Sequence, residues 1–217
     1  MGAGIAGLGF EKLVYGGLTK VFAGIVIAPI GGIIFGLLLT TLIITIFASK
    51  RPGPVNKTFG KLQIVSSAWF ALTHGANDGQ KTMGIIVLIL FSAGMIPELE
   101  MPLWVIFAAA TAMGLGTFFG GYKVIKTLGF KITKLRPYQG FAAETAGGAM
   151  LAVFAVFGIP ASTTHAITGT IMGAGAARRK RAVRWKVSRQ IVFSWIITIP
   201  GAAAMGIGFT YLIHLFV

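Results

Sequence analysis

Long apolar stretches alternate with short polar ones along this chain. Apolar runs long enough to cross a bilayer occur at roughly residues 20–48, 103–122 and 190–217. Two further apolar regions, residues 62–96 and 139–177, are each interrupted near the middle by a polar cluster. The pattern predicts an all-α polytopic membrane protein built as a helical bundle.

The first interruption places an amide and an acid, Asn77 and Asp78, inside residues 62–96. A carboxylate at the centre of a membrane helix costs about 2.5–3.5 kcal/mol on insertion scales. Gly75 and Gly79 flank the pair and weaken a helix at the same point. We therefore expect a discontinuous helix, broken near Asn77 and Asp78, with a coordination site at the break.

The second interruption divides residues 139–177 at Pro160, which forbids a continuous helix. Residues 139–158 and 165–177 then form two helices, arranged either as a re-entrant hairpin or as two full crossings. Non-helical backbone survives at membrane depth only where it lines a cavity, so a polar tip favours the re-entrant hairpin. The tip carries three hydroxyl side chains: Ser162, Thr163 and Thr164.

Composition agrees with a membrane protein and excludes several other classes. The chain is 55% hydrophobic and only 11% charged, whereas ordinary soluble domains carry about 25% charged residues. The absence of cysteine excludes disulfides and thiolate metal sites. The sequence also has no catalytic Ser/His/Asp order, no paired zinc ligands and no P-loop, so we do not expect an enzyme or a cofactor.

The net charge of +14 raises the possibility of a nucleic-acid partner, but the positions of the charges argue against it. Basic residues gather in three segments, 50–61, 123–136 and 178–189, whereas the connection 97–102 is acidic. This asymmetry is typical of the positive-inside rule. We expect a multi-pass protein of the cell (plasma) membrane whose three basic loops are cytoplasmic and contact the lipid bilayer, with no nucleic-acid partner.

The two ends of the chain match when the sequence is compared with itself at a shift of 171 residues. The matching pairs are Met1–Gly4 with Met172–Gly175, and Val21, Phe22, Ile25 and Pro29 with Val192, Phe193, Ile196 and Pro200. Gly/Ala bias alone can produce the first block, but the in-register proline favours a true repeat. We expect residues 1–48 to be the last helix of a preceding repeat and residues 49–217 to form a second one.

Three segments together resemble the inorganic phosphate transporter (PiT) family. They are Gly75–Lys81, Gly140–Glu144 and Pro160–Ala166, followed by a basic loop and two tryptophans, Trp185 and Trp195. The resemblance implies two inverted repeats, each with one Asn-Asp and one Ser/Thr motif, that carry phosphate with sodium or protons. Because one copy of each motif is present, it also implies that this chain is the C-terminal half and that its partner is a missing N-terminal repeat.

The hydroxyl tip has chemistry that suits phosphate. The first turn of a helix presents backbone N–H groups without intrahelical partners and the positive end of the helix dipole. The hydroxyls can add donors to such an anion site, although they can also simply cap the helix. With the Asn-Asp motif, the candidate phosphate site is Ser162, Thr163, Thr164, Asn77 and Asp78.

Carboxylate and amide oxygens also suit a hard cation. The candidate coupling-cation ligands are Asn77, Asp78 and Glu144. The alternatives are a structural network of Asp78 with His74 and Lys81, and an interfacial Glu144 paired with Arg136 or a loop lysine. Gln80, Lys81 and His165 are candidate supporting residues. His165 could donate to phosphate or relay a proton, or it could be a packed histidine bonded to a backbone carbonyl.

Charge balance predicts cotransport. Phosphate together with two carboxylates is unfavourable in a low dielectric unless cations enter with it. We therefore expect phosphate symport coupled to sodium or protons. The alternatives are a membrane subunit that is inactive alone and pairs with a separate first half, and a carrier of another oxyanion such as sulfate. A homo-oligomer is also compatible with the sequence.

Overall fold

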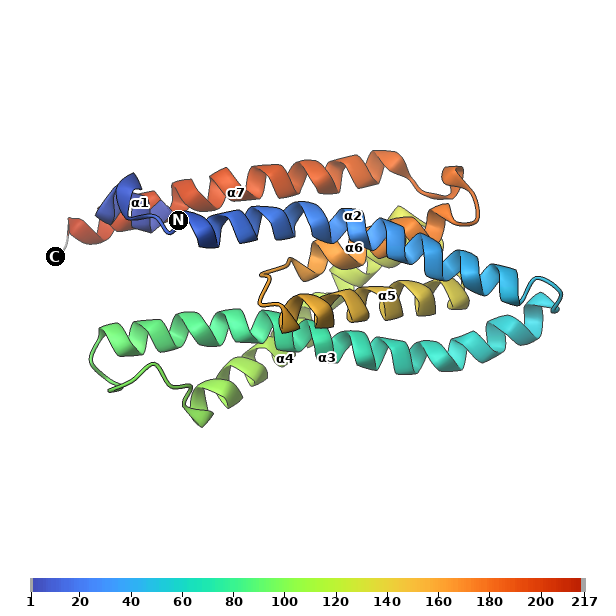
Figure 1. Cartoon of the computed structure of the whole chain (residues 1–217), viewed down its shortest axis with the longest axis horizontal. Coiled ribbons are helices and arrows are strands. Elements are labelled where there is room, and N and C mark those ends of the chain that lie inside the picture. Colours follow the sequence, from blue (N-terminus) through green and yellow to red (C-terminus); the bar gives the residue numbers. More distant parts are fainter. Residues whose placement is uncertain (1, 216–217) are drawn as a thin grey trace.

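The computed structural model describes residues 2–215, which form helices joined by turns and loops, without strands. Its elements are α1 (Gly2–Leu8), η1 (Phe10–Lys12), α2 (Tyr15–Ile46), α3 (Pro52–Ser92), α4 (Leu103–Lys126), η2 (Thr127–Ile132), α5 (Pro137–Val156), α6 (Thr163–Ala176), η3 (Lys180–Ala182) and α7 (Trp185–His214). Helices α2, α3 and α7 run roughly along one common axis, and α4 crosses them obliquely (Figure 1). The predicted all-α bundle is confirmed. The outermost residues of the two predicted repeats, 1 and 216–217, lie outside the described residues.

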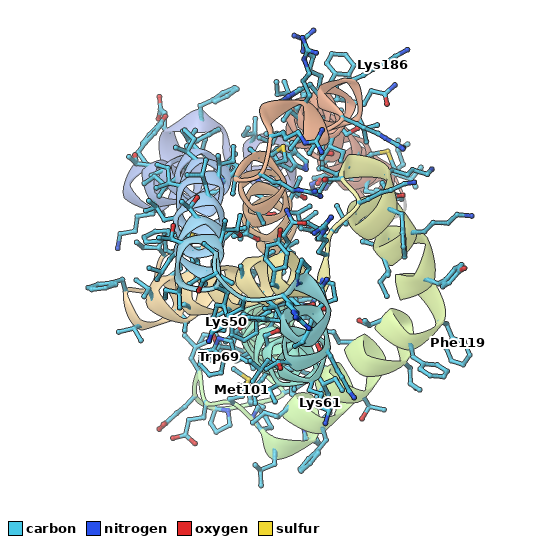
Figure 2. All side chains as sticks on the ribbon, turned by 90° about the vertical axis from the view of Figure 1, so that its right-hand side faces the viewer. Lys50, Lys61, Trp69, Met101, Phe119 and Lys186 are labelled. Atoms are coloured by element: carbon cyan, nitrogen blue, oxygen red, sulfur yellow. The ribbon has the colours of Figure 1, made fainter. Side chains whose placement is uncertain are left out.

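Four of the described helices are long and apolar enough to cross a membrane. These spans are Tyr15–Ile46, Leu103–Tyr122, Pro137–Val156 and Trp185–His214. Many large apolar side chains point away from the bundle; Phe118 and Phe119 of α4 are each 79% exposed, and Figure 2 shows Phe119 projecting outward. Outward apolar faces fit a lipid environment, and the chain is a multi-pass membrane protein.

The predicted break at Asn77 and Asp78 is wrong, because α3 is one continuous helix of 41 residues. Each glycine in a helix interior costs only about 1 kcal/mol relative to alanine, and contacts with α5 offset this cost. The Asn77 side-chain amide donates to the carbonyls of Thr73 (2.9 Å) and Leu151 (3.3 Å). Side-chain bonding and packing therefore keep this stretch helical.

The basic segment 50–61 is also mostly helix rather than loop. Pro52 occupies the first helical position of α3, where its missing N–H is not needed. A helix of this length is about 62 Å long, which exceeds the about 30 Å hydrocarbon core of a bilayer. The first turns of α3 lie at the end of the bundle where α2 ends and α7 begins (Figure 1).

The polypeptide turns sharply between α5 and α6. Gly158 adopts a positive φ of 61°, and the Ile159 amide donates to the Phe154 carbonyl at 2.9 Å. This is a Schellman motif, so α5 ends at Val156, four residues before Pro160. The α6 helix has 14 residues, or about 21 Å, which is too short to cross a hydrocarbon core of about 30 Å.

The tip of the α5–α6 hairpin lies beside the middle of α3, and both arms return to the same end of the bundle (Figure 1). At the base of the hairpin, Gln139 accepts from the Arg136 amide (3.0 Å) and donates to the Ala174 carbonyl (2.8 Å). The predicted hairpin is thus present with a re-entrant shape.

Glycines bring α2 and α6 into backbone contact. A Cβ atom added to Gly169 would overlap the carbonyl oxygen of Pro29, and one added to Gly173 would overlap that of Ile33. From the other side, a Cβ at Gly32 would lie 2.7 Å from the carbonyl oxygen of Ala166. The hairpin's second arm is therefore fixed against α2 by close packing of small residues.

This packing predicts the effect of a single methyl group. We expect Gly173→Ala to lower the free energy of unfolding by about 1–3 kcal/mol, because the methyl forces two backbones apart. The matched control is Gly116→Ala in α4, where a Cβ meets nothing within 4 Å and alanine should be neutral or stabilising by up to about 1 kcal/mol. Thermal unfolding of the purified protein in detergent checks both; equal shifts would contradict the packing described.

Candidate functional site

The hairpin tip meets α3 at Asp78. The Thr163 hydroxyl donates to Oδ2 of Asp78 at 2.8 Å. The Lys81 ammonium lies 3.0 Å from Oδ1 of Asp78 and donates to the Ala161 carbonyl at 2.7 Å. The structure thus joins the acidic motif of α3 to the first residues of α6, as expected from the sequence.

The carboxylate of Asp78 has a third partner in its own helix. Nε2 of His74, one turn earlier, lies 3.0 Å from Oδ2. The His74 ring is in turn stacked on Phe70, with ring centroids 5.9 Å apart. The structural network of Asp78 with His74 and Lys81 is therefore present, and every nearby donor stabilises the charged carboxylate.

The Asp78 cluster lies deep along the bundle. About 21 Å of helical rise separates Asp78 from the end of α3 at Ser92. In Figure 1 the hairpin tip reaches α3 well away from both ends of the long helices. This depth makes the Asp78 carboxylate costly to leave without partners.

The beginning of α6 presents hydrogen-bond donors. Ser162 is the N-cap, and its hydroxyl accepts from the His165 amide at 3.4 Å. The amides of Thr163 and Thr164 occupy the first two helical positions, which have no intrahelical acceptor. Ser162 is half-buried and Thr164 is exposed, whereas Thr163 is buried. Two amides and the hydroxyls of Ser162 and Thr164 can therefore donate to an anion.

Thr163 has a different hydrogen-bonding role from the one the sequence suggested. A hydroxyl has one hydrogen to donate, and the Thr163 hydrogen goes to Asp78. In this arrangement its hydroxyl oxygen can accept but cannot also donate to phosphate. Ser162 differs, because its hydroxyl oxygen accepts from the His165 amide while its hydroxyl hydrogen stays available. Ser162 can therefore cap α6 and donate to an anion at the same time.

Asn77 points toward α5 rather than toward the hairpin tip. Adjacent residues of a helix lie about 100° apart around its axis. The Asn77 side chain is buried, and both of its amide bonds reach backbone carbonyls, those of Thr73 and Leu151. These contacts place Asn77 in the α3–α5 interface. Both bonds are donated by its side-chain nitrogen.

Glu144 also lies in the α3–α5 interface, away from Asp78. It accepts hydrogen bonds from the Ser66 hydroxyl (2.5 Å) and the Gln63 amide (3.5 Å). About 18 Å of helical rise separates Ser66 from Asp78 on α3, so the three candidate cation ligands do not form one cluster. Among the side chains that the structure describes, the ion pairs all involve Asp78, so the alternative pairing of Glu144 with Arg136 is absent.

The partners of Glu144 were missed by sequence reasoning. Gln63 and Ser66 are three residues apart and share one helical face. A polar pair on one face of an apolar helix was the sequence feature that could have indicated a buried partner. Gln80, a candidate supporting residue, is exposed on α3, and no bond joins it to the hairpin tip in the described part of the chain. Residues 2–215 also contain no cluster of three His, Asp or Glu side chains that could hold a metal ion.

His165 anchors the first turn of α6 to its neighbours. Its ring is tilted against Trp195 of α7 with centroids 3.9 Å apart, and it lies beside the carbonyl of Ile25. Pro29, four residues after Ile25, has no N–H, so this carbonyl lacks its helical partner. The His165 ring packs there, and its contacts match the packed-histidine alternative.

Comparison with known proteins identifies the family. The sequence model of the phosphate transporter family matches residues 47–206. The chain belongs to the phosphate transporter family. Two relatives, from Rhizobium meliloti and Bacillus subtilis, are 48% and 41% identical to it, each over 94% of this chain. Both bear the name "Probable low-affinity inorganic phosphate transporter".

The transporter-family relatives are longer than this chain, which covers 61% and 62% of their respective lengths. A solved structure of a sodium-dependent phosphate transporter superposes with a TM-score of 0.84 over 100% of this chain and 72% of its own. The identity of that pair is 22%, so this similarity establishes the fold alone. The names of these relatives are those of transporters rather than enzymes.

The contacts of Asn77 generate a stability prediction. In Asn77→Asp a carboxylate would face two carbonyl oxygens, and we expect a loss of about 1–3 kcal/mol or more in the free energy of unfolding. Gln80→Glu adds the same charge three residues away on an exposed position and should cost less. Thermal unfolding of both variants checks this; an equal loss would show that Asn77 does not hold α3 to α5.

Proposed function

We propose that this chain is the C-terminal half of a carrier that moves inorganic phosphate across the cell membrane by symport with sodium or protons. The observation that carries the proposal is the contact between Asp78 and the first turn of α6, deep in the bundle. It joins a carboxylate to a set of anion donors. The names and lengths of the relatives support both the substrate and the half-carrier assignment.

Phosphate binds, in this proposal, at the beginning of α6. The amides of Thr163 and Thr164 donate to its oxygens, and the positive end of the helix dipole attracts its charge. The hydroxyls of Ser162 and Thr164 add two neutral donors. Neutral donors suit a carrier, because no permanently charged arginine fork holds the anion too tightly for release.

Coupling follows from the charge of Asp78 beside the phosphate. Phosphate carries about one to two negative charges near neutral pH, and the Asp78 carboxylate lies one hydrogen bond away from the proposed site. Lys81 offsets the charge of Asp78, which leaves the charges of phosphate and Glu144 uncompensated; in a low dielectric they oppose binding unless further positive charge is present. Glu144, in the α3–α5 interface, is the second carboxylate at which a proton or cation can be taken up during the cycle.

The remaining part of the carrier contributes a second repeat. Phosphate then lies between this hairpin tip and the corresponding tip of the other repeat, and rocking of one bundle against the other gives alternating access. The segments 50–61, 123–136 and 178–189 face the cytoplasm, where their basic residues contact anionic headgroups. Chains of the length seen in the relatives would hold both repeats.

The donors predict a graded loss of transport. In the full-length carrier we expect Ser162→Ala and Thr164→Ala each to weaken phosphate affinity about tenfold or more, since each removes a hydrogen bond to a charged group worth about 1.5–3 kcal/mol. Thr117→Ala, an exposed threonine of α4, is the matched control. Uptake of radiolabelled phosphate by proteoliposomes gives the affinities; unchanged uptake in both tip variants would remove the site assignment.

Charge balance predicts the cation dependence. We expect phosphate affinity to rise as sodium is added or as pH falls, because either cation offsets the repulsion between phosphate and the carboxylates. Phosphate binding to the purified carrier is measured with sodium or choline at two pH values. Binding that is equal under all four conditions would contradict ion coupling.

A further inference from the structure

The ammonium group of Lys81 occupies the space between α3 and the hairpin tip. It touches Oδ1 of Asp78 at 3.0 Å and the backbone carbonyl of Ala161 at 2.7 Å. The two oxygens come from different elements, one from the middle of α3 and one from the extended segment that precedes α6. A single positive charge therefore bridges the two parts of the proposed site.

The oxygens around Lys81 are those a bound hard cation would use. A carboxylate oxygen and a backbone carbonyl are typical ligands of such ions. The Thr163 hydroxyl, bonded to the other oxygen of Asp78, brings a third oxygen to the same carboxylate. An ammonium group is a compact point charge with several donors, so it can fill a position that would otherwise hold an alkali cation.

We propose that Lys81 is a tethered substitute for sodium at Asp78. The inference rests on the proposed function and sharpens it. The lysine charge stays with the protein, so this carboxylate is neutralised without a transported ion. Any sodium that accompanies phosphate then binds elsewhere in the carrier.

The same contact gives Lys81 a positioning role. Two of its three N–H groups are used by Asp78 and Ala161. The third is available to a phosphate oxygen, because 43% of the Lys81 side chain is exposed. Lys81 therefore ties the hairpin tip to α3 while it supplies a positive charge beside the donors of α6.

A purely structural ion pair makes a different prediction. If Lys81 only neutralises Asp78, its removal leaves a less stable protein that gains no ion. If it stands in for sodium, its removal frees Oδ1 of Asp78 and the Ala161 carbonyl as cation ligands, while His74 and Thr163 still bond to Oδ2. Sodium binding, rather than stability, separates the two.

The test is equilibrium binding of radioactive sodium to the purified full-length carrier without phosphate. Lys81→Met should bind one more sodium per carrier than wild type, and the double variant Lys81→Met/Asp78→Asn should lose it again. Lys61→Met removes a lysine from an exposed position of the same helix and should match wild type. Lys81→Gln repeats the test with a polar side chain, should the methionine variant fail to fold.

Folded Lys81 variants that bind no more sodium than wild type would overturn the inference. A second readout is phosphate binding: sodium should strengthen it at least tenfold more in Lys81→Met than in wild type, and equal strengthening would also count against Lys81. Absence of phosphate binding in wild type under every cation condition would instead refute the proposed function, and the sodium measurement would still decide the role of Lys81.

Discussion

A carboxylate held deep inside a membrane protein needs partners, and the arrangement of this bundle follows from the partners of Asp78. Two of them, His74 and Lys81, come from the same face of α3. The third, the Thr163 hydroxyl, comes from the beginning of α6. This last bond requires a helix to begin at mid-depth, which in turn requires a chain that enters the membrane, turns and leaves on the same side.

Several local features hold that turn in place. Gly158 ends α5 at the required depth, and the glycines of α6 let its backbone lie directly on α2. Pro29 leaves the Ile25 carbonyl without a helical partner, and the His165 ring lies beside it. The first turn of α6 is thus fixed from α2, α3 and α7 together, so its free amides are presented in a defined direction. Such preorganised donors suit recognition of an oxyanion.

The spans, the turn of the hairpin and the position of the site could be predicted from the sequence, because each depends on residues that are close together in the chain. Apolar runs indicate the spans, Pro160 indicates the interruption, and a carboxylate among apolar residues indicates the site. The continuity of α3 could not be predicted in this way. The glycines argue for a break, and the bonds from Asn77 to α5 that oppose it involve residues far apart in sequence. Tertiary contacts outweigh helix propensity here.

Orientation and depth were also beyond sequence reasoning. Asn77 and Asp78 are neighbours in the chain, yet one faces α5 and the other the hairpin tip, because a helix turns about 100° per residue. Glu144 belongs to a motif of the same family but lies nearer the hairpin base, where Ser66 and Gln63 bind it. Asp78 and Glu144 belong to motifs of the same family, yet they lie in different parts of the bundle.

The central claim is that the first turn of α6, held by Asp78, binds the transported oxyanion. Its most direct test is a crystal structure of the full-length carrier soaked with arsenate, whose arsenic atom can be located by anomalous scattering. We expect an arsenate oxygen about 3 Å from the amide nitrogen of Thr164, with Asp78 facing the same cavity. An oxyanion bound elsewhere in the bundle, or an Asp78 side chain turned toward the lipid, would contradict the account.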